Sequence, residues 1–156
     1  MNNYSKVFKN DFLDKKVIIA GCNGYIGSEL CNQFNINNIS YIGIDKIENT
    51  DSNIKCLNFN LLNRDKVFDI ISKEKPDFFI HAATHSALAY KNNFLESFME
   101  DNQVLYNIIS ALRLKNQSKL LYFSSSYVYS GLNLNGNVDE TTILNPKHNF
   151  GIAKSF

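Results

Sequence analysis

Three regularly spaced glycines are the residues of this chain with the clearest chemistry. Gly21, Gly24 and Gly27 directly follow an apolar, β-branched run at residues 17–20. A glycine turn between a strand and a helix lets the backbone bend tightly and lets peptide N–H groups approach an anion at the helix N-terminus. The segment therefore predicts a site for the pyrophosphate of a dinucleotide, with a purely structural glycine turn as the alternative.

An acidic residue at the expected distance supports this interpretation. Asp45 closes the next apolar run, residues 41–44, about twenty residues after the turn, where a ribose-binding acid is expected. A carboxylate at that place accepts hydrogen bonds from both ribose hydroxyls and repels a 2′-phosphate, which favours NAD over NADP. Lys46 beside it weakens the repulsion, and a turn acid at the end of a strand is the alternative for Asp45.

Hydrophobic periodicity predicts the elements that must position these residues. Strands are expected at about residues 16–20, 39–44, 54–59, 77–80 and 120–123. Helices are expected at about residues 25–34, 64–73 and 93–115, with a loop at 131–146 and a further helix from about Lys147. Strands that alternate with helices predict an α/β fold, a doubly wound parallel sheet of the Rossmann type with five strands in the order 3-2-1-4-5.

The domain organisation follows from the same pattern. Residues 1–14 are expected to be an amphipathic N-terminal lead-in that packs on the sheet, and residues 15–156 to be one NAD-binding Rossmann domain. The apolar side chains of the lead-in are Val7, Phe8, Phe12 and Leu13.

Composition narrows the choice of partners. The chain has 156 residues, 44% of them hydrophobic, and a formal net charge of +1, so it offers no electrostatic reason for nucleic acid or an anionic membrane as a partner. Cys22, Cys31 and Cys56 are an odd set without Cys-x-x-Cys spacing, which favours reduced thiols and no metal site. No apolar run reaches the roughly 18 residues of a membrane span, and we expect a cytoplasmic protein.

The spacing Gly-x-x-Gly-x-x-Gly resembles that of the extended short-chain dehydrogenase/reductases, specifically the NAD-dependent epimerase/dehydratase family, which modifies nucleotide-activated sugars. The resemblance covers residues 15–154. Residues 81–84 are similar to the family's His-x-Ala-Ala pattern, and residues 124–129 to its Ser-Ser-x-x-Val-Tyr segment. The resemblance implies NAD as cofactor and a nucleotide-activated sugar as substrate. It assigns no proton transfer to His81, and no motif gives a role to His85 or Ser86.

The resemblance also implies a set of cofactor contacts. Asn60 stands where the family carries an aspartate beside the adenine, and its amide oxygen can still accept from the adenine amino group. Asn102 matches a helix asparagine of the family, and asparagine within a helix suggests a buried polar role, bracing the sheet or the nicotinamide side. The expected cofactor-binding residues are Gly21, Asn23, Gly24, Tyr25, Ile26, Gly27, Asp45, Lys46, Asn60, Leu61, Ala82, Ala83, Thr84, Asn102 and Lys154.

Catalytic positions follow from the resemblance as well. Ser125 is expected to polarise the sugar hydroxyl or keto group as hydride moves. The family's Tyr-x-x-x-Lys pair corresponds to Phe150 and Lys154, where the lysine would hold the nicotinamide ribose. Phenylalanine keeps the ring and deletes the phenol that serves as general acid and base. Because such catalysis contributes about 10²–10⁴-fold, its loss raises the barrier by about 3–5 kcal/mol.

The resemblance implies an epimerase-like oxidoreductase acting through a keto intermediate. Dehydratases of the family carry acidic residues after the catalytic serine or threonine, where this chain has Ser126 and Tyr127, so dehydration is disfavoured. The family's carboxy-terminal substrate domain would follow Lys154, and we therefore expect a truncated member, inactive alone. The alternatives are a keto-sugar reductase fragment, a non-catalytic nucleotide-binding module, which would act in a homo- or hetero-oligomer with a complete relative, and an inert remnant.

Overall fold

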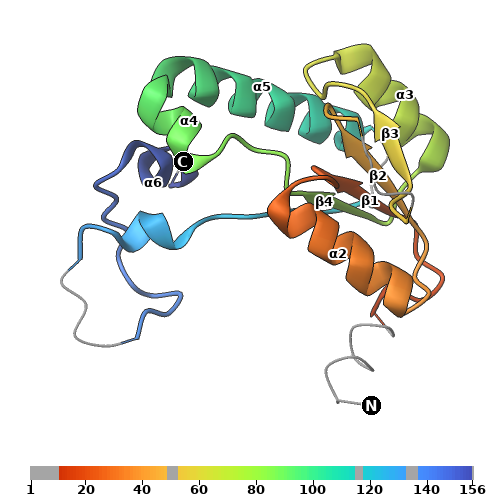
Figure 1. The fold of residues 1–156 in the computed structure, drawn as a ribbon, viewed down its shortest axis with the longest axis horizontal. Helices are drawn as coiled ribbons and strands as arrows, with labels where there is room; N and C mark the ends of the chain where they lie inside the picture. The colour runs from red at the N-terminus through yellow and green to blue at the C-terminus, as the bar shows by residue number, and fades with distance from the viewer. Residues whose placement is uncertain (1–10, 49–52, 115–117, 133–136, 156) are drawn as a thin grey trace. The chain divides into compact units, whose positions relative to one another are not determined.

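A five-stranded parallel sheet organises the chain. The computed structural model describes residues 11–48, 53–114, 118–132 and 137–155 (Figure 1). The strands lie in the order β3-β2-β1-β4-β5, and every neighbouring pair is parallel. The predicted fold class and strand order are therefore confirmed. The strands are β1 (Val17–Ala20), β2 (Tyr41–Asp45), β3 (Cys56–Asn58), β4 (Phe78–His81) and β5 (Lys119–Tyr122).

The helices connect these strands in the alternation that the sequence predicts. Those described are α2 (Tyr25–Ile36), α3 (Arg64–Glu74), α4 (Ala87–Asn92), α5 (Phe94–Arg113), the 3-10 helix η1 (Ser126–Tyr129) and α6 (Asn149–Lys154). In the described part of the chain, no helix is both long enough and apolar enough to pass through a membrane.

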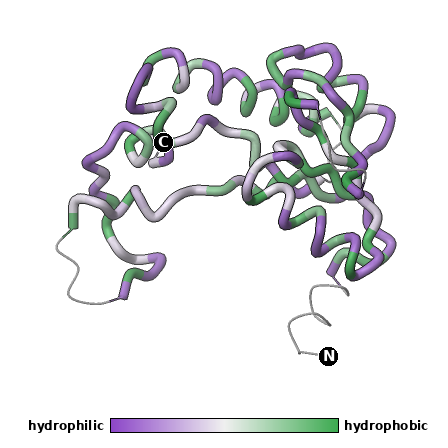
Figure 2. Tube along the Cα trace, viewed as in Figure 1, coloured by the Kyte–Doolittle hydropathy of each residue, from purple (hydrophilic) through white to green (hydrophobic). Residues whose placement is uncertain are grey.

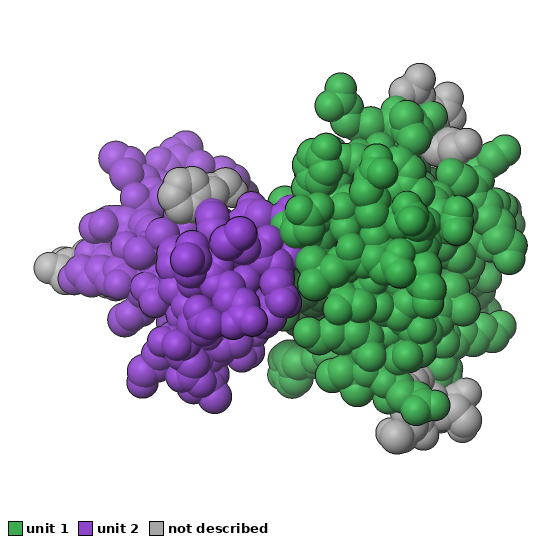
Figure 3. All heavy atoms as spheres, turned by 90° about the horizontal axis from the view of Figure 1, so that it is seen from above, with its two compact units in different colours: residues 1–84, 103–122 green, residues 85–102, 123–156 purple. Residues whose placement is uncertain are grey.

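The chain divides into two compact units, which Figure 3 distinguishes by colour. The first unit consists of residues up to 84 together with 103–122, and it contains the sheet. The second consists of residues 85–102 and 123–156, with α4, η1 and α6. The helix α5 belongs to both units, because its residues up to Asn102 lie in the second and the remainder in the first.

The core of the first unit forms on the central strands. Every residue of β1 is buried, as expected for a parallel strand covered on both faces. One apolar cluster joins strand residues such as Ile18 and Phe79 to Val67 of α3 and Ile108 of α5, so these two helices cover one face. Figure 1 shows α2 on the opposite face, and Figure 2 shows the hydrophobic residues concentrated on the strands and the inner sides of these helices.

Two of the four apolar side chains of the predicted lead-in lie within the described residues. Phe12 packs between Phe34 of α2 and Phe78 of β4, with ring centroids 5.1 and 5.0 Å away. Leu13, by contrast, is 53% exposed, so its predicted packing is wrong. Val7 and Phe8 lie outside the described residues.

Most predicted boundaries agree with the structure to within two residues, and two short helices were missed. The third strand is shorter than predicted, and residues 133–136 of the expected loop lie outside the described residues. Both missed helices begin with a serine cap: the Ser86 hydroxyl accepts from Ala89 N–H before α4, and the Ser125 hydroxyl accepts from Tyr127 N–H before η1. Helices of only 6 and 4 residues are too short to show a clear apolar period.

Candidate functional site

The glycine turn has the geometry that a dinucleotide site requires. Gly21 has φ +83°, which glycine alone adopts readily. Its N–H donates to the carbonyl of Ile44 at 2.7 Å. A Cβ at this position would lie 2.7 Å from the backbone of Ala82 and of Ala83. Any side chain at position 21 would therefore push β1 and β4 apart at their carboxyl ends.

The other two glycines have different surroundings. A Cβ on Gly27 would lie 1.9 Å from the Gly21 carbonyl oxygen, so Gly27 is needed for packing between α2 and the turn. A Cβ on Gly24 would meet that same oxygen at 3.2 Å, and among the described residues it would make no other contact within 4 Å. Gly24 therefore leaves open space above the start of α2.

The N-terminus of α2 is available to an anion. Gly24 is the N-cap residue, and no side chain of the described residues caps the helix. The first turn contains no acidic residue, so nothing there competes for the unpaired N–H groups or for the positive end of the helix dipole. A pyrophosphate over Gly24 would satisfy these groups, and the residues present therefore fit the phosphates of a dinucleotide.

Asp45 lies directly beside this turn at the end of β2. Its side chain accepts two backbone hydrogen bonds of 3.0 Å, one from Asn23 N–H and one from Ile47 N–H. The residue is only 9% exposed. The carboxylate is thus held in a fixed orientation next to the turn, and each oxygen keeps a lone pair for a ribose hydroxyl.

The other residues of the first unit that were predicted to bind the cofactor differ in exposure and in their hydrogen-bond partners. Tyr25 is 96% and Ile26 44% exposed at the start of α2. The Asn23 amide group donates to the Ile47 carbonyl at 2.7 Å, so its side chain braces the turn. Lys46 is exposed, and Thr84 is half-buried.

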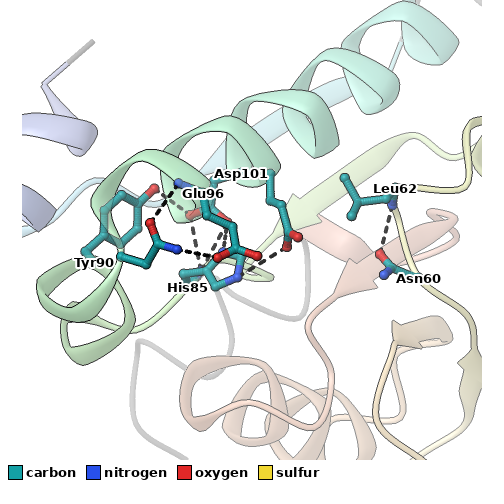
Figure 4. A network of polar contacts seen from close by, with 8 residues as sticks. Asn60, Leu62, His85, Tyr90, Glu96 and Asp101 are labelled. Atoms are coloured by element: carbon teal, nitrogen blue, oxygen red, sulfur yellow. Dashed lines mark hydrogen bonds and ion pairs between the residues drawn. The ribbon is translucent and has the colours of Figure 1, made fainter.

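In the segment after β3, the residues predicted to contact the cofactor already make contacts within the protein. The Asn60 side-chain oxygen, predicted to accept from the adenine, already accepts from Leu62 N–H at 2.9 Å (Figure 4), although a second lone pair remains. Leu61 is 6% exposed and packs in the core cluster. Ala82 donates its N–H to the Ala20 carbonyl, which keeps the small residues after β4 close to Gly21.

The prediction of a buried polar role for Asn102 is wrong. Asn102 is exposed, and its amide group donates to the Phe98 carbonyl one turn earlier in α5. Asn107 has the buried role instead: it is fully buried and donates to the carbonyls of Leu61 and Leu62 at 3.0 and 3.3 Å. An asparagine five residues later in the same helix thus ties α5 to the segment after β3.

The second unit contains the three predicted catalytic positions. Lys154 is 7% exposed, and its Nζ lies 5.8 Å from the centroid of the Phe150 ring. A Cβ on Gly151 would lie 2.4 Å from the Tyr127 carbonyl oxygen, so α6 packs closely on η1. Ser125 caps η1 through its hydroxyl. Burial lowers the pKa of Lys154, and the negative charge of Asp101 opposes that shift.

A polar network in the second unit was not predicted. Asp101 is 8% exposed, and its Oδ1 lies 2.7 Å from His85 Nδ1 (Figure 4). The other oxygen accepts from the Tyr90 hydroxyl at 2.8 Å. His85 Nε2 lies 3.4 Å from a carboxylate oxygen of Glu100. Sequence spacing does not predict this network, because its members come from α4, from α5 and from the segment before α4.

The network is linked to the Phe150 position through an aromatic ring. The centroid of the Tyr90 ring lies 5.5 Å from the centroid of the Phe150 ring, and the centroid of the Tyr127 ring lies 5.9 Å from that of Phe150. The Tyr90 hydroxyl is committed to Asp101. Among the described residues, no group of three or more histidines, cysteines and acids is arranged to hold a metal ion.

Comparison with known proteins gives a consistent result. The family model described as "NAD dependent epimerase/dehydratase family" matches residues 17–156. Among curated proteins, the chain is 29% identical over 173 residues to dTDP-D-glucose 4,6-dehydratase of Dictyostelium discoideum, which covers 94% of this chain and 39% of that protein. It is 24% identical to dTDP-4-dehydrorhamnose reductase of Aggregatibacter actinomycetemcomitans, over 90% of this chain and 44% of that one. The chain thus spans less than half the length of these relatives.

Solved structures share the fold. UDP-glucose-4-epimerase of Stenotrophomonas maltophila, solved with bound NAD and formylated UDP-arabinopyranose, gives a TM-score of 0.79 at 19% identity, over 90% of this chain and 46% of that one. The enzyme WbmH of Bordetella bronchiseptica, solved in complex with NAD+, gives a TM-score of 0.75 at 21% identity, over 90% and 50%. Since the family model matches nearly the whole chain, this protein belongs to the NAD-dependent epimerase/dehydratase family.

Proposed function

We propose that the first unit binds NAD, and that the chain is the cofactor-binding part of an epimerase-like oxidoreductase acting on a nucleotide-activated sugar. The observation that carries the proposal is the glycine turn: Gly24 leaves space above an uncapped helix N-terminus, and the Asp45 carboxylate is fixed directly beside it. Phosphate and ribose of one nucleotide need these two features next to each other.

The fixed carboxylate favours NAD over NADP. Asp45 is 9% exposed and is oriented by two backbone N–H groups, so it cannot turn away from a 2′-phosphate. Two like charges at close range in a partly buried site repel each other strongly. Lys46 is exposed, so water screens its charge more than that of the carboxylate.

Bound NAD would supply a hydride acceptor and donor, and the chain's own residues would position the reactants. The peptide N–H groups at the start of α2 would bind the pyrophosphate, and Asp45 would bind a ribose. In the second unit, the Ser125 hydroxyl would polarise a hydroxyl or keto group of the sugar. Lys154 would hold the nicotinamide ribose, because its ammonium group is buried beside the Phe150 ring.

Calorimetry on the purified chain tests the cofactor proposal. We expect saturable NAD binding, weaker NADP binding, and at least a tenfold loss of NAD affinity in Asp45→Ala, since a charge-assisted hydrogen bond contributes about 1.5–3 kcal/mol. The matched control is Asp69→Ala, which removes an exposed acid of α3 and should bind like the parent. A folded chain that binds no NAD, or an Asp45→Ala variant that binds NAD unchanged, would contradict the proposal.

A non-catalytic NAD-binding module is the second candidate, and Phe150 is the observation that favours it. The ring at this position has no hydroxyl group that could transfer a proton, and the nearby Tyr90 hydroxyl donates to Asp101. We therefore expect hydride transfer to nucleotide-activated sugars, followed as NADH absorbance, to be undetectable in the parent chain.

The variant Phe150→Tyr separates this candidate from an oxidoreductase. It restores a phenol beside Lys154, whose positive charge should bring the pKa of that phenol below its ordinary value of about 10. An absorbance titration of the variant measures this directly. A phenol that titrates at or above about 10 would show that the second unit no longer supports acid-base chemistry at this position.

A further inference from the structure

Two thiols meet at the base of the glycine turn. Cys22 Sγ lies 2.8 Å from Cys56 Sγ, although the two cysteines are 34 residues apart and come from the turn and from β3. Both are free thiols in this structure, as is Cys31. A bonded pair of sulfur atoms is about 2.05 Å apart, so only a small approach separates these two thiols from a covalent bond.

A glycine in β2 creates the space for this contact. Gly43 is the ladder partner of Cys56 in the pairing of β2 with β3. A Cβ on Gly43 would lie 2.8 Å from Cys22 Sγ and 2.9 Å from Cys22 Cβ. The Cys22 side chain therefore fills the volume that any other residue at position 43 would occupy, and this places it against Cys56 on the adjacent strand.

The backbone around both thiols is held in place. The N–H groups of Gly21 and Cys22 both donate to the Ile44 carbonyl, and Gly43 donates to the Lys55 carbonyl. Asn23 also donates from its amide group to Cys56 Sγ at 3.9 Å. The meeting of the two sulfur atoms thus follows from fixed sheet and turn geometry.

The two thiols differ in access to solvent. Cys22 is fully buried, and burial raises its pKa well above the usual range of a thiol. Cys56 is half-buried, so a reagent in solution reaches Cys56 first. Cys31 is fully buried, and burial raises its pKa to about 11.

We propose that Cys22 and Cys56 form a redox modification site, a dithiol that closes to a disulfide and ties the glycine turn to β3. The oxidant is a small-molecule disulfide such as oxidised glutathione. This site is independent of the proposed cofactor and substrate, because it needs only the two thiols and the sheet.

The exchange proceeds in two balanced steps. The Cys56 thiol gives up its proton, and its sulfur attacks one sulfur of the small disulfide. A mixed disulfide forms, the original S–S bond breaks, and one small thiol leaves with a proton. The Cys22 sulfur then attacks the Cys56 sulfur as it loses its own proton, and the second small thiol leaves protonated. Two protein thiols are oxidised, and one small disulfide is reduced to two thiols.

Intact mass and thiol counting on the full chain test the proposal. The reduced, denatured chain has three cysteines to titrate. After treatment with oxidised glutathione, we expect one titratable thiol, no retained glutathione, and a peptide map that joins Cys22 to Cys56. The crosslink should raise the Tm of the chain by on the order of 5–10 °C, and dithiothreitol should reverse the rise.

Three variants give the proposal distinct signatures. Cys31→Ala is the matched control and should form the disulfide as the parent does. Cys22→Ala should stop at the first step and retain one glutathione on Cys56. Cys56→Ser replaces a half-buried residue of a strand with 3 residues; it should fold, resist oxidised glutathione, and show no rise in Tm.

Specific outcomes would overturn the proposal. They are a parent chain that keeps all its thiols under oxidised glutathione, a disulfide that involves Cys31 or a second chain, and a Cys56→Ser variant whose Tm rises on oxidation as the parent's does.

Discussion

The glycine turn of the first unit and the residue 150 segment of the second follow the family pattern to different degrees. In the turn, a Cβ on Gly21 or on Gly27 would overlap nearby backbone atoms, and two backbone N–H groups donate to the Asp45 carboxylate. In the second unit, Lys154 is buried beside Phe150, at the position where the sequence resemblance leads us to expect a phenol.

The fold itself constrains the glycine turn more than it constrains position 150. A glycine that prevents backbone overlap is required for folding whether or not a ligand binds. A phenol at position 150 is required only for proton transfer, because phenylalanine fills almost the same volume. Substitutions in the glycine turn are therefore expected to lower the stability of the chain. A substitution at position 150 is expected to change only proton transfer.

The largest effect is expected from a methyl group at the turn. Gly27→Ala places a Cβ 1.9 Å from the Gly21 carbonyl oxygen, and neither backbone segment can move without disrupting β1. We expect a loss of about 3 kcal/mol in the free energy of unfolding, measured by urea denaturation. Gly24→Ala is the matched control, because its Cβ would lie 3.2 Å from the Gly21 carbonyl oxygen, and it should cost under about 1 kcal/mol.

Equal stability of Gly27→Ala and Gly24→Ala would contradict this prediction. In that case, packing at Gly27 would not distinguish it from Gly24, and the turn would be no more constrained by the fold than position 150. NAD affinity gives a second reading, since Gly24→Ala fills the space expected for the pyrophosphate while leaving the fold intact.

A substitution at Asp101 is expected to destabilise only the second unit. Asp101→Ala removes the acceptor of the Tyr90 hydroxyl and the partner of His85 Nδ1. Because Tyr90 is 1% exposed, its hydroxyl would be left buried without its acceptor, at a cost of about 2–3 kcal/mol. Hydrogen exchange should show faster exchange of amides in residues 85–102, while amides of β1 and β2 in the first unit exchange as in the parent.

The neighbouring acid is the control for Asp101. The Glu100 side chain is 36% exposed, and its contact with His85 Nε2 is 3.4 Å long, so Glu100→Ala should cost under about 0.5 kcal/mol. If Asp101→Ala accelerated amide exchange in β1 and β2 as much as in residues 85–102, the two units would not unfold separately.

The sequence predicted the first unit better than the second for a physical reason. The runs of β1, β2 and β4 are apolar and mostly buried, so their hydrophobic pattern locates them, and the glycine spacing places the turn between β1 and α2. In the second unit, α4 and η1 are short and are defined by serine caps. A single capping serine is too common in a sequence to predict a helix.

Side-chain roles that depend on tertiary contact were the least predictable. Asn102 and Asn107 have the same residue type in the same helix, yet only Asn107 turns toward the carbonyls of Leu61 and Leu62. The choice depends on which face of α5 meets the segment after β3. The Cys22–Cys56 contact likewise depends on strand register and on Gly43, neither of which sequence spacing reveals.

The smallest predicted effect concerns the buried lysine that the second unit retains. Burial lowers the pKa of Lys154 in the folded chain, so between that lowered value and about 10.5 the unfolded chain binds more protons. The cost of burying charged Lys154 is therefore absent above its pKa in the unfolded chain. That cost grows as the pH falls toward its lowered pKa in the folded chain. Lys154→Met should remove this dependence and raise stability near neutral pH.

Urea denaturation from pH 7 to 10.5 measures this effect, with exposed Lys147 replaced by methionine as the control. The difference in unfolding free energy between Lys154→Met and the parent should shrink as the pH rises, because the parent lysine loses its buried charge. Lys147→Met should show no such trend, since an exposed ammonium group is solvated in both states. A constant difference across this range would mean that burying the charged lysine costs no stability. The surroundings of Lys154 would then be better suited to a charged lysine than the phenylalanine at position 150 indicates.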